Sequence, residues 1–375
     1  MRIALGIHRL QPRGGLEDNC LRIAAELDRR GHEATLFVAG ACPDVKFPVV
    51  SIAPRRKPSS NHVRAAAFAT AFVNATNGRF DRTVAFQPAP GAEILFLADA
   101  LRNRADTPFL KRLTPRFRTF ARLEQGCFDT PAKTRIIGVA LSQMRAAVER
   151  YPSSRERVAV IPPAIAETRR RPELRDQLRP AARAELGLAP DEPAWLWLGL
   201  QPEIKGLDRV IEALPDHPRA RLLVGGLGSG DHKMRKPLAR AAQLGVGDRI
   251  RCMGYISGDR FFKAVAAADV LAHPARVEVA GAVILEAIVN GLPVVTTDIC
   301  GFAGRILEAG AGKVVTGPFA ADTFSRFLGD VGGAGNEDLS RRGIAYGANP
   351  ELYSGVDVAC DLIEAEHWPA PPEGL

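Results

Sequence analysis

The sequence lacks the marks of a secreted or membrane-spanning protein. Its first residues enter a strand-like segment, Ile3 to Ile7, without the long apolar core or the small-residue cleavage site of a signal peptide. The longest uncharged stretch, beside Glu286, is interrupted by Gly291 and Pro293 and does not suit a membrane span. The six cysteines form no Cys-x-x-Cys pair, which predicts reduced thiols in the cytosol and no zinc site.

What the sequence does have is an ordinary globular composition with an excess of positive charge. The 375 residues are 46% hydrophobic and 25% charged, and the net charge is +8. A chain of this length fits two domains of about 150 to 200 residues. The charge favours anionic partners, which could be nucleic acid, an anionic membrane or a phosphorylated substrate. Composition alone does not choose among them.

Strand-like and helix-like segments alternate in two series, which predicts an α/β protein with two doubly wound domains. The first series has strands near 3–7, 34–38, 83–86, 94–97, 135–140 and 158–161, and helices near 16–30 and 142–150. The second has strands near 195–198, 221–224, 249–253, 270–273 and 293–297, and helices near 207–214, 233–244, 259–267 and 281–290.

The segment between the two series, residues 166–193, is charged and punctuated by proline, as expected of a linker. We therefore expect residues 1–165 to form a first Rossmann-like domain and residues 166–351 a second one. A last helix within about 352–375 is expected to pack back on the first domain.

Two carboxylates, Glu278 and Glu286, stand in an otherwise apolar run. Gly291 and Pro293 predict that a helix ends here and a buried strand follows. If the helix begins near Gly281, its free N–H groups suit a phosphate. Glu286 would then lie roughly 8 Å along the axis, where it could accept two ribose hydroxyls, and Glu278 would face an attached sugar. The alternative is an acidic helix cap, with Glu286 paired to a neighbouring arginine.

Three other polar residues follow predicted strands, where α/β proteins place their sites. Lys205, which precedes Gly206, could bind a diphosphate as a point charge or remain a solvated loop lysine. Asp99 could act as a general base towards an acceptor hydroxyl or only cap the next turn. His273 could contact a ligand or be a packed core histidine.

Glycine-rich loops follow two of the predicted strands. Gly14 and Gly15 would let a phosphate or sugar approach the backbone. The next polar residues, Asp18 and Asn19, could bind acceptor hydroxyls or only occupy the first helical turn. The loop at 225–230 could approach a ligand, but it lacks the Lys-Ser/Thr of a phosphate-binding P-loop.

Residues 100–135 form a basic segment with Arg102, Arg104, Lys111, Arg112, Arg116, Arg118, Arg122, Lys133 and Arg135. Thr114 and Pro115 predict the start of a helix, whose aromatic face opposes its arginines. We predict that this helix binds an anionic membrane surface. Its membrane-binding residues would be Lys111, Arg112, Arg116, Phe117, Arg118, Phe120 and Arg122. Glu124 does not fit this face, and the alternative is a core-packed helix with a solvated basic side.

The Glu278 and Glu286 pair, Lys205-Gly206 and the Gly-x-Pro-Val-Val strand resemble the GT4 family of retaining nucleotide-sugar glycosyltransferases. Within that family the chain is similar nearly end to end to the bacterial lipopolysaccharide core glucosyltransferases, in features that include Asn61-His62 and the Phe and Arg pattern at 109–122. The resemblance implies a GT-B fold. It also implies UDP-glucose in the second domain and a heptose of the phosphorylated lipopolysaccharide core in the first.

The resemblance further implies roles for single residues. Glu278 would contact the donor sugar and Glu286 the ribose. The expected catalytic residues are Asp99, Glu278 and Lys205; the donor-binding residues are Gly14, Gly15, Lys205, Glu278, Ala280, Gly281, Ala282 and Glu286; and the acceptor-binding residues are Asp18, Asn19, Asn61 and His62. The family retains the configuration of the donor sugar, and the absence of an obvious nucleophile suggests front-face substitution. In that mechanism the leaving phosphate helps to deprotonate the acceptor hydroxyl, and Asp99 only orients this hydroxyl.

The cations around the diphosphate depart from the family pattern. The family commonly has an arginine just after the strand glycine, whereas Leu200 follows Gly199 here and Ile204 precedes Lys205. Manganese-dependent glycosyltransferases hold their cation with an Asp-x-Asp pair, and this sequence has none. We therefore expect no metal and no cofactor, with Lys205 and the helix N-terminus supplying the positive field.

These features predict a cytoplasmic enzyme that associates peripherally with the inner membrane. Its expected partners are UDP-glucose or a related UDP-sugar, a lipopolysaccharide core acceptor and an anionic membrane, but not nucleic acid. One alternative is a GT4 transferase that uses UDP-linked GlcNAc, galactose or uronic acid, or another glycolipid or polysaccharide acceptor. Others are a UDP-sugar epimerase and a basic protein that only binds membranes or nucleic acid.

Overall fold

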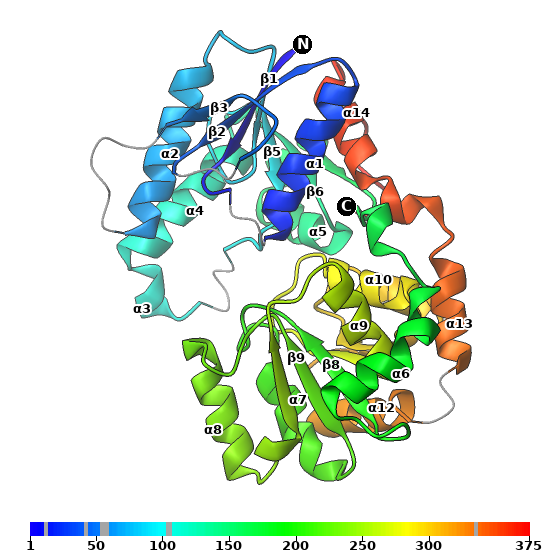
Figure 1. Cartoon of the computed structure of the whole chain (residues 1–375). Coiled ribbons are helices and arrows are strands. Elements are labelled where there is room, and N and C mark those ends of the chain that lie inside the picture. Colours follow the sequence, from blue (N-terminus) through cyan, green and yellow to red (C-terminus); the bar gives the residue numbers. More distant parts are fainter. Residues whose placement is uncertain (11–13, 41–43, 53–59, 103–106, 334–336) are drawn as a thin grey trace. The chain divides into compact units, whose positions relative to one another are not determined.

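The computed structural model describes residues 1–10, 14–40, 44–52, 60–102, 107–333 and 337–375, and the chain divides into two compact units (Figure 1). Unit 1 comprises Met1–Ala164 and Tyr353–Leu375, and unit 2 comprises Ile165–Leu352. The sequence had placed these boundaries at 165/166 and 351/352. Arg104, named above, and Cys42, one of the six cysteines, lie outside the described residues.

Unit 1 is built on a parallel sheet of seven described strands in the order β3-β2-β1-β4-β5-β6-β7. The strands are β1 (Arg2–Ile7), β2 (Glu33–Val38), β3 (Val49–Ser51), β4 (Arg82–Ala85), β5 (Ile94–Leu97), β6 (Arg135–Gly138) and β7 (Val158–Val160). The helices are α1 (Gly15–Arg29), α2 (Asn61–Thr76), α3 (Phe109–Arg112), α4 (Pro115–Phe128), α5 (Leu141–Arg150) and α14 (Gly355–Glu364). Strand order reverses between β1 and β4, which makes this edge a topological switch point.

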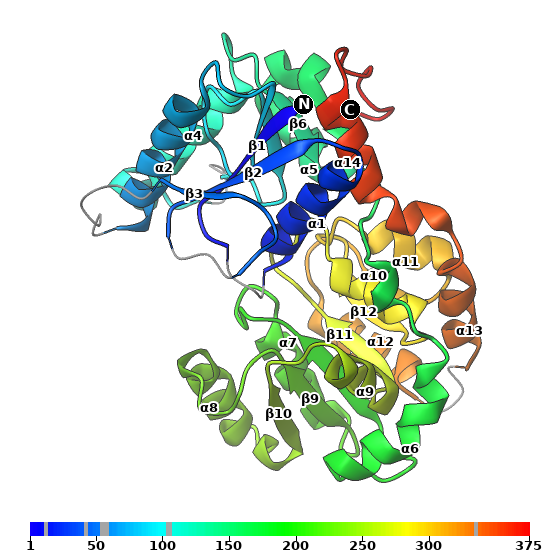
Figure 2. The same cartoon turned by 45° about the horizontal axis from the view of Figure 1, so that its top comes forward.

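Both faces of this sheet are covered, as its continuous apolar strands require. Phe72 of α2 packs in one cluster against β1 and β4, and Phe128 of α4 and Met144 of α5 pack in a second cluster against β5 and β6. On the other face, α1 and the C-terminal helix α14 lie side by side (Figures 1 and 2). The helix expected at the end of the chain thus packs on unit 1.

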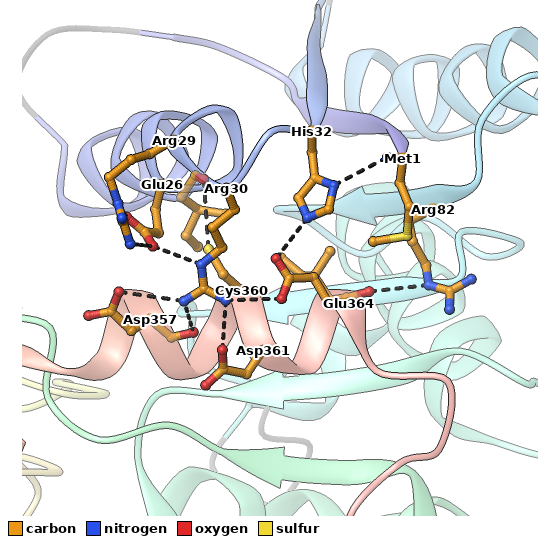
Figure 3. A network of polar contacts seen from close by, with 12 residues as sticks. Met1, Glu26, Arg29, Arg30, His32, Arg82, Asp357, Cys360, Asp361 and Glu364 are labelled. Atoms are coloured by element: carbon orange, nitrogen blue, oxygen red, sulfur yellow. Dashed lines mark hydrogen bonds and ion pairs between the residues drawn. The ribbon is translucent and has the colours of Figure 1, made fainter.

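A network of ion pairs joins α14 to the end of α1 (Figure 3). The Arg30 guanidinium lies 2.7 Å from Glu26 Oε1, 2.6 Å from Asp361 Oδ1 and 3.0 Å from Glu364 Oε2. The other oxygen of Glu364 lies 2.8 Å from His32 Nε2. The Arg30 side chain is only 18% exposed, so these partners provide the hydrogen bonds that water would otherwise provide.

Unit 2 is built on a second parallel sheet, with six described strands in the order β10-β9-β8-β11-β12-β13. The strands are β8 (Ala194–Leu198), β9 (Arg221–Gly225), β10 (Ile250–Gly254), β11 (Val270–His273), β12 (Val294–Thr297) and β13 (Gly312–Val315). The helices are α6 (Leu174–Leu186), α7 (Leu207–Ala213), α8 (Arg235–Gln243), α9 (Asp259–Ala267), α10 (Ala282–Val289), α11 (Ala303–Ala309), α12 (Ala321–Val331) and α13 (Glu337–Tyr346).

The helices of unit 2 form a layer on each face of its sheet. Helix α7 packs against α8 and α12, and their core includes Trp195, Trp197 and Phe324. On the other face, α10 packs against α11 and α13, and α9 packs against α6. The two doubly wound parallel sheets confirm the predicted α/β class and its two Rossmann-like domains. The sequence patterns had not revealed α2, β3 or the elements from α11 to α13.

The prediction that residues 166–193 form a linker was wrong, because Leu174–Leu186 of this segment is the folded helix α6. Pro180 lies inside the helix, where proline costs about 3 kcal/mol. Two arginines offset this cost by binding the end of α9. Arg179 donates to the carbonyl oxygens of Ala266 and Ala268 at 2.9 and 3.0 Å, and Arg183 donates to that of Ala267 at 2.7 Å. The charges that suggested a solvated linker are therefore docking contacts.

Candidate functional site

The loops that follow β8 and β11 pack tightly at the carboxyl edge of the unit 2 sheet. Gly206 has a left-handed backbone with φ +71°, and a Cβ there would lie 2.0 Å from the carbonyl oxygen of Pro274. Gly199 donates its N–H to the Gly225 carbonyl at 3.0 Å, which joins the ends of β8 and β9. Only glycine fits at position 206, so this contact fixes where Lys205 leaves the backbone.

Arg276 joins the same two loops, in a contact that sequence patterns did not reveal. Its guanidinium donates to both carboxylate oxygens of Asp208 at 2.7 and 2.6 Å, and its backbone N–H donates to the Ile204 carbonyl at 2.8 Å. Desolvation opposes the ionisation of Asp208, but the Arg276 hydrogen bonds hold the pKa of this carboxyl below its usual value. This bidentate pair holds the loop that leads to α10.

Glu278 lies in that loop and has two cationic neighbours. Its Oε2 atom is 2.6 Å from Lys205 Nζ and 3.1 Å from His273 Nε2. Lys205 also donates to the Val277 carbonyl at 3.3 Å. The structure thus brings together three residues that the sequence had marked separately. His273, which the sequence left open between core residue and ligand contact, is 1% exposed but hydrogen-bonded to the site.

The electrostatics of this group favour an ionised carboxylate. Desolvation would raise the pKa of Glu278, but His273 and Lys205 outweigh it and lower that pKa to about 2. Desolvation would likewise lower the pKa of His273, but its contacts with Cys300 and Glu278 raise it to about 9. At neutral pH, Glu278 is therefore a carboxylate held between two positive charges.

Helix α10 begins directly after this loop. Its N-cap residue, Gly281, is left-handed with φ +83°, and no side chain of the described residues caps the helix. Ala280 accepts a hydrogen bond at its carbonyl from the Phe302 N–H at 2.9 Å, and Ala282, the first helical residue, is exposed. The first N–H groups of α10 are therefore uncapped beside Glu278, an arrangement that suits an anion.

Glu286 lies on α10, in the second turn, and its side chain is 17% exposed. Its Oε1 atom is 3.5 Å from Arg169 Nε. The sequence had left open whether Glu286 meets a ribose or a neighbouring arginine, and this contact supplies the arginine. The Arg169 guanidinium also lies over the Phe261 ring, 4.7 Å from its centroid, so the arginine is itself held in place.

A lysine from another loop lies where the family arginine is missing. Lys233 Nζ donates to the Leu200 carbonyl at 2.9 Å. Lys233 belongs to the short 3₁₀ helix His232–Met234, which follows the glycine-rich loop after β9. Since β9 neighbours β8 in the sheet, Lys233 brings its charge to the loop that also carries Lys205. The sequence reasoning missed this residue, although a lysine just after a glycine-rich loop on the neighbouring strand was a usable signal.

The predicted residues at the start of unit 1 lie around the N-terminus of α1. Gly14 is the extended N-cap residue and Gly15 is the first helical residue. A Cβ at Gly14 would lie 1.8 Å from Glu17 Oε2, but this is the end of a flexible side chain, so the contact does not by itself require glycine. Asp18 is exposed and lies 4.0 Å from Arg22, and Asn19 is half-buried. Their positions agree with the first-turn alternative and leave an acceptor role untested.

The remaining unit 1 residues lie at the ends of two other elements. Asn61 and His62 begin α2, and His62 Nε2 lies 3.4 Å from the hydroxyl of the N-cap residue Ser60. Asp99 follows β5, its side chain is exposed, and its carbonyl accepts a hydrogen bond from Gln143 at 2.8 Å. Asp99 is therefore available to solvent at the carboxyl edge of the sheet.

Part of the apolar face of α4 is packed into unit 1. Thr114 caps the helix by accepting a hydrogen bond from the Phe117 N–H at 3.3 Å. Phe128 is fully buried and Ala121 is 4% exposed, while Phe120 is covered by the Arg102 guanidinium at 4.5 Å from its ring centroid. The buried part of this face supports the core-packed alternative, whereas Phe117 and Phe120 are half-buried, and contact of this helix with a membrane stays a prediction.

Glu124, which did not fit the membrane-facing helix, is a buried structural carboxylate. It is 3% exposed and accepts hydrogen bonds from the Arg102 N–H at 2.8 Å and the Tyr151 hydroxyl at 3.0 Å. Arg150 lies 3.0 Å from the same carboxylate. These three partners compensate the buried charge of Glu124, which did not fit the predicted aromatic face.

The solvent-facing side of α3 and α4 is both basic and apolar. Phe109, Leu110 and Leu113 are 68%, 77% and 44% exposed. A surface hollow of about 400 Å³ adjoins them and is lined by Arg112, Phe117, Arg118, Ala121, Arg122 and Gln125. Lys111 and Arg116 are exposed beside it. The apolar part of this surface is therefore α3, which the sequence analysis had not singled out.

The described residues offer neither a cluster of metal-ligating side chains nor a helix that could cross a membrane. They contain no group of three or more His, Cys, Asp or Glu side chains arranged to hold a metal ion. No helix among them combines the length and the apolar character that crossing a membrane requires.

The sequence is similar to known glycosyltransferases. Residues 179–330 match the family described as glycosyl transferases group 1. The chain is 33% identical to the lipopolysaccharide glucosyltransferase WaaG of Escherichia coli (strain K12), over 97% of this chain and 98% of that protein. It is 31% identical to the D-inositol 3-phosphate glycosyltransferase of Nocardia farcinica, over 62% of this chain and 52% of that protein.

Solved structures agree with these sequence matches. The crystal structure of WaaG, a glycosyltransferase of lipopolysaccharide biosynthesis, superposes with a TM-score of 0.88 at 30% identity, covering 97% of this chain and all of that one. Anabaena Alr3699/HepE, solved in complex with UDP and glucose, superposes with a TM-score of 0.71 at 16% identity, covering 97% of this chain and 99% of that one. Together with the two Rossmann-like units, the WaaG match confirms the predicted GT-B fold.

Proposed function

The chain belongs to the group 1 glycosyltransferases, and we propose that it transfers glucose from UDP-glucose to a heptose of the lipopolysaccharide inner core. The observation that carries this proposal is the 33% identity to a lipopolysaccharide glucosyltransferase along almost the whole of both chains. Identity of this extent includes both units, and therefore both the donor and the acceptor side of such an enzyme.

The donor would bind at the carboxyl edge of the unit 2 sheet. The uncapped N–H groups of α10 and the ammonium of Lys205 would hold the diphosphate. Lys233, anchored on the Leu200 carbonyl, would supply the second positive charge that the family places on an arginine. Glu286 would accept the ribose hydroxyls, and Arg169 would remain beside it or move aside. No metal or cofactor takes part in this proposal.

Glu278 would contact the transferred sugar, and the reaction would retain its configuration. Among the residues that the structure describes, we identify no obvious nucleophile on this edge, so we favour front-face substitution. The acceptor hydroxyl forms the new glycosidic bond on the face from which the phosphate leaves, and its proton passes to the leaving phosphate oxygen. Lys205 and the α10 amides stabilise the charge that develops on UDP.

The acceptor would bind unit 1, where Asp18, Asn19, Asn61, His62 and Asp99 lie at the ends of strands or the starts of helices. Asp99 is exposed and can orient an acceptor hydroxyl. The net charge of +8 suits a phosphorylated acceptor. Gly14 and Gly15 would let a sugar or phosphate approach the start of α1.

The enzyme would dock on the cytoplasmic side of the inner membrane through α3. The exposed Phe109 and Leu110 would enter the headgroup region, while Lys111, Arg112 and the α4 arginines would contact anionic lipid. This proposal keeps the predicted basic residues and replaces the aromatic face of α4 by the apolar side of α3.

A transfer assay tests the proposed function directly. Purified full-length protein is incubated with UDP-linked glucose, galactose, GlcNAc or glucuronic acid and with lipopolysaccharide truncated at the heptoses, and the product is weighed by mass spectrometry. With UDP-glucose we expect the mass of the lipopolysaccharide acceptor to increase by one hexose, and we expect NMR to show an α-linkage. Transfer of another sugar would identify a different donor. Conversion of UDP-glucose to another UDP-sugar without acceptor would favour an epimerase. Salt-sensitive binding to DNA, with no binding of UDP, would favour a non-enzymatic role.

A further inference from the structure

Glu278 is shared by a mobile cation and a rigid one. Lys205 and His273 both bind its Oε2 atom, at 2.6 and 3.1 Å. The Lys205 side chain is 23% exposed and ends a flexible four-carbon stem, whereas the His273 side chain is 1% exposed. A ligand at this edge can therefore reach the lysine but not the imidazole.

The backbone holds His273 in the sheet. It is the last residue of β11 and pairs in register with Thr296 of β12. Thr296 Oγ1 also donates to the His273 carbonyl at 3.0 Å, and the Ala275 N–H donates to the same carbonyl at 2.9 Å. His273 therefore keeps its place when the loop above it rearranges.

Donor binding as proposed above places two demands on Lys205. The lysine is within 2.6 Å of Glu278, yet the diphosphate requires the same ammonium. Glu278 is only 15% exposed, and removing one partner from a buried ion pair is costly because the remaining charge is left uncompensated. If a second cation remains beside Glu278 when Lys205 moves away, the carboxylate is still paired and this cost is avoided.

We propose that His273 is a positioning residue of the donor site, which keeps Glu278 ionised and oriented while Lys205 turns from this carboxylate to the diphosphate. This inference rests on the proposed function, because it requires a nucleotide diphosphate as ligand. His273 touches neither the sugar nor the phosphates and acts only through Glu278.

The charges that face the imidazole are consistent with this role. Its ionisable neighbours are Cys300 and Glu278, with Lys205 behind the Glu278 carboxylate. Burial opposes protonation and Nδ1 has no hydrogen-bond partner among the described residues, yet Cys300 and Glu278 raise the pKa of His273 to about 9. When Lys205 leaves and a diphosphate arrives, one positive charge departs and negative charge approaches. Both changes raise the pKa of His273 further.

Proton uptake provides the first test. UDP binding to the full-length protein is measured by calorimetry at about pH 9 in two buffers that differ in ionisation enthalpy. The phosphates of UDP are fully ionised there, since a second phosphate pKa is near 6. We expect wild type to take up a fraction of a proton and His273→Gln to take up less.

A double variant provides the second test. Gln at position 273 keeps a hydrogen-bond donor but not the charge, so Lys205 stays with Glu278 and UDP binds about tenfold more weakly, equivalent to about 1.4 kcal/mol. Adding Glu278→Gln removes the carboxylate that competes for Lys205, and UDP affinity recovers. A merely structural role for His273 predicts no such recovery. His217→Gln is the matched control, because His217 is a hydrogen-bonded histidine elsewhere in unit 2.

The outcomes separate this inference from the proposed function. If wild type does not bind UDP at all, the proposed function fails. If wild type binds UDP but both variants match it in affinity and proton uptake, only the role of His273 is overturned. Should His273→Gln not fold, nitrogen-15 NMR of histidine-labelled wild type with UDP at about pH 8 decides. A doubly protonated His273 ring supports the inference, and a neutral ring overturns it.

Discussion

Glu286 carries a charge in an apolar helix and receives its partner from a distant segment of the chain. The spacing from Glu278 was visible in the sequence, and it led to the prediction of a ribose contact. The Arg169 contact at 3.5 Å could not be predicted, because it depends on how the segment before α6 crosses unit 2. A carboxylate can accept hydrogen bonds at both of its oxygens, so the Arg169 contact does not by itself exclude a ribose.

We predict that Glu286→Gln weakens UDP binding by about tenfold. The substitution removes charge-assisted hydrogen bonds to the ribose, which are worth about 1.5–3 kcal/mol. Calorimetry with UDP measures the effect, and Glu212→Gln, on α7 of the same unit, is the control because its side chain is 49% exposed. Equal UDP affinity in wild type and Glu286→Gln would show that the ribose lies elsewhere.

Lys233 gives a second prediction at the scale of single residues. If it supplies the missing charge at the diphosphate, Lys233→Gln should weaken UDP binding by about five- to tenfold, about 1–1.4 kcal/mol, and leave the binding of uridine unchanged. Lys233→Arg should restore most of the loss. Lys236→Gln, an exposed lysine on α8, is the control. A parallel loss for UDP and uridine would indicate that Lys233 only supports the loop through Leu200.

At the scale of elements, α4 illustrates the limit of helical-wheel arguments. The wheel correctly identified an apolar face and a basic face on this helix. It could not say whether the apolar face meets lipid or protein, since both environments select the same side chains. Burial of Phe128 and Ala121 shows that this part of the face meets protein, while Phe109 and Leu110 of the short helix α3 are exposed.

We expect the double substitution Phe109→Ser with Leu110→Ser to lower binding to anionic vesicles by about tenfold or more. Each exposed apolar side chain that leaves water can contribute about 1.5–3 kcal/mol when fully buried, and less at an interface. Sedimentation with vesicles containing anionic lipid measures this, and zwitterionic vesicles report the charge dependence. Leu307→Ser, a 58% exposed leucine on α11, is the control. Unchanged sedimentation of the double variant would rule out α3 as the docking element.

At the scale of the whole molecule, the chain returns to unit 1 after completing unit 2. The returning helix α14 carries Asp357, Asp361 and Glu364, which meet Arg30 and His32 (Figure 3). Arg135 also donates to the Ala365 carbonyl at 3.0 Å, beyond the end of α14. The C-terminal segment is thus part of unit 1, and its removal would expose apolar residues of α1.

The ion-pair network predicts a loss of stability in acid. Hydrogen bonds from Arg29, and then from Arg30, lower the pKa of Glu26 from 4.5 to about 2, although desolvation opposes them. A depressed carboxyl pKa contributes stability above pH 4.5 that is lost as the pH falls towards 2. We expect amides at the end of α1 to lose protection over that range, measured relative to their intrinsic exchange rates.

The same network should respond to a single substitution. Arg30→Gln should accelerate amide exchange in residues 355–364 already at neutral pH, because three carboxylates lose a shared partner, and it should weaken the acid dependence. Hydrogen-exchange mass spectrometry measures both effects. Arg341→Gln, whose side chain is 74% exposed and 3.7 Å from Asp338, is the control. Wild-type protection of α14 in Arg30→Gln would mean that apolar packing alone holds this helix.

The sequence by itself determined the alternation of strands and helices and the position of the Glu278 and Glu286 segment. Strands buried on both faces need continuous apolar runs, and helix ends favour glycine or proline, so the local sequence specifies these features. Only the tertiary structure decided that α6 is a packed helix, that part of the α4 apolar face is buried, that Lys205 and His273 contact Glu278, and that Arg169 contacts Glu286. Those choices depend on contacts between residues far apart in the chain, which no local pattern encodes.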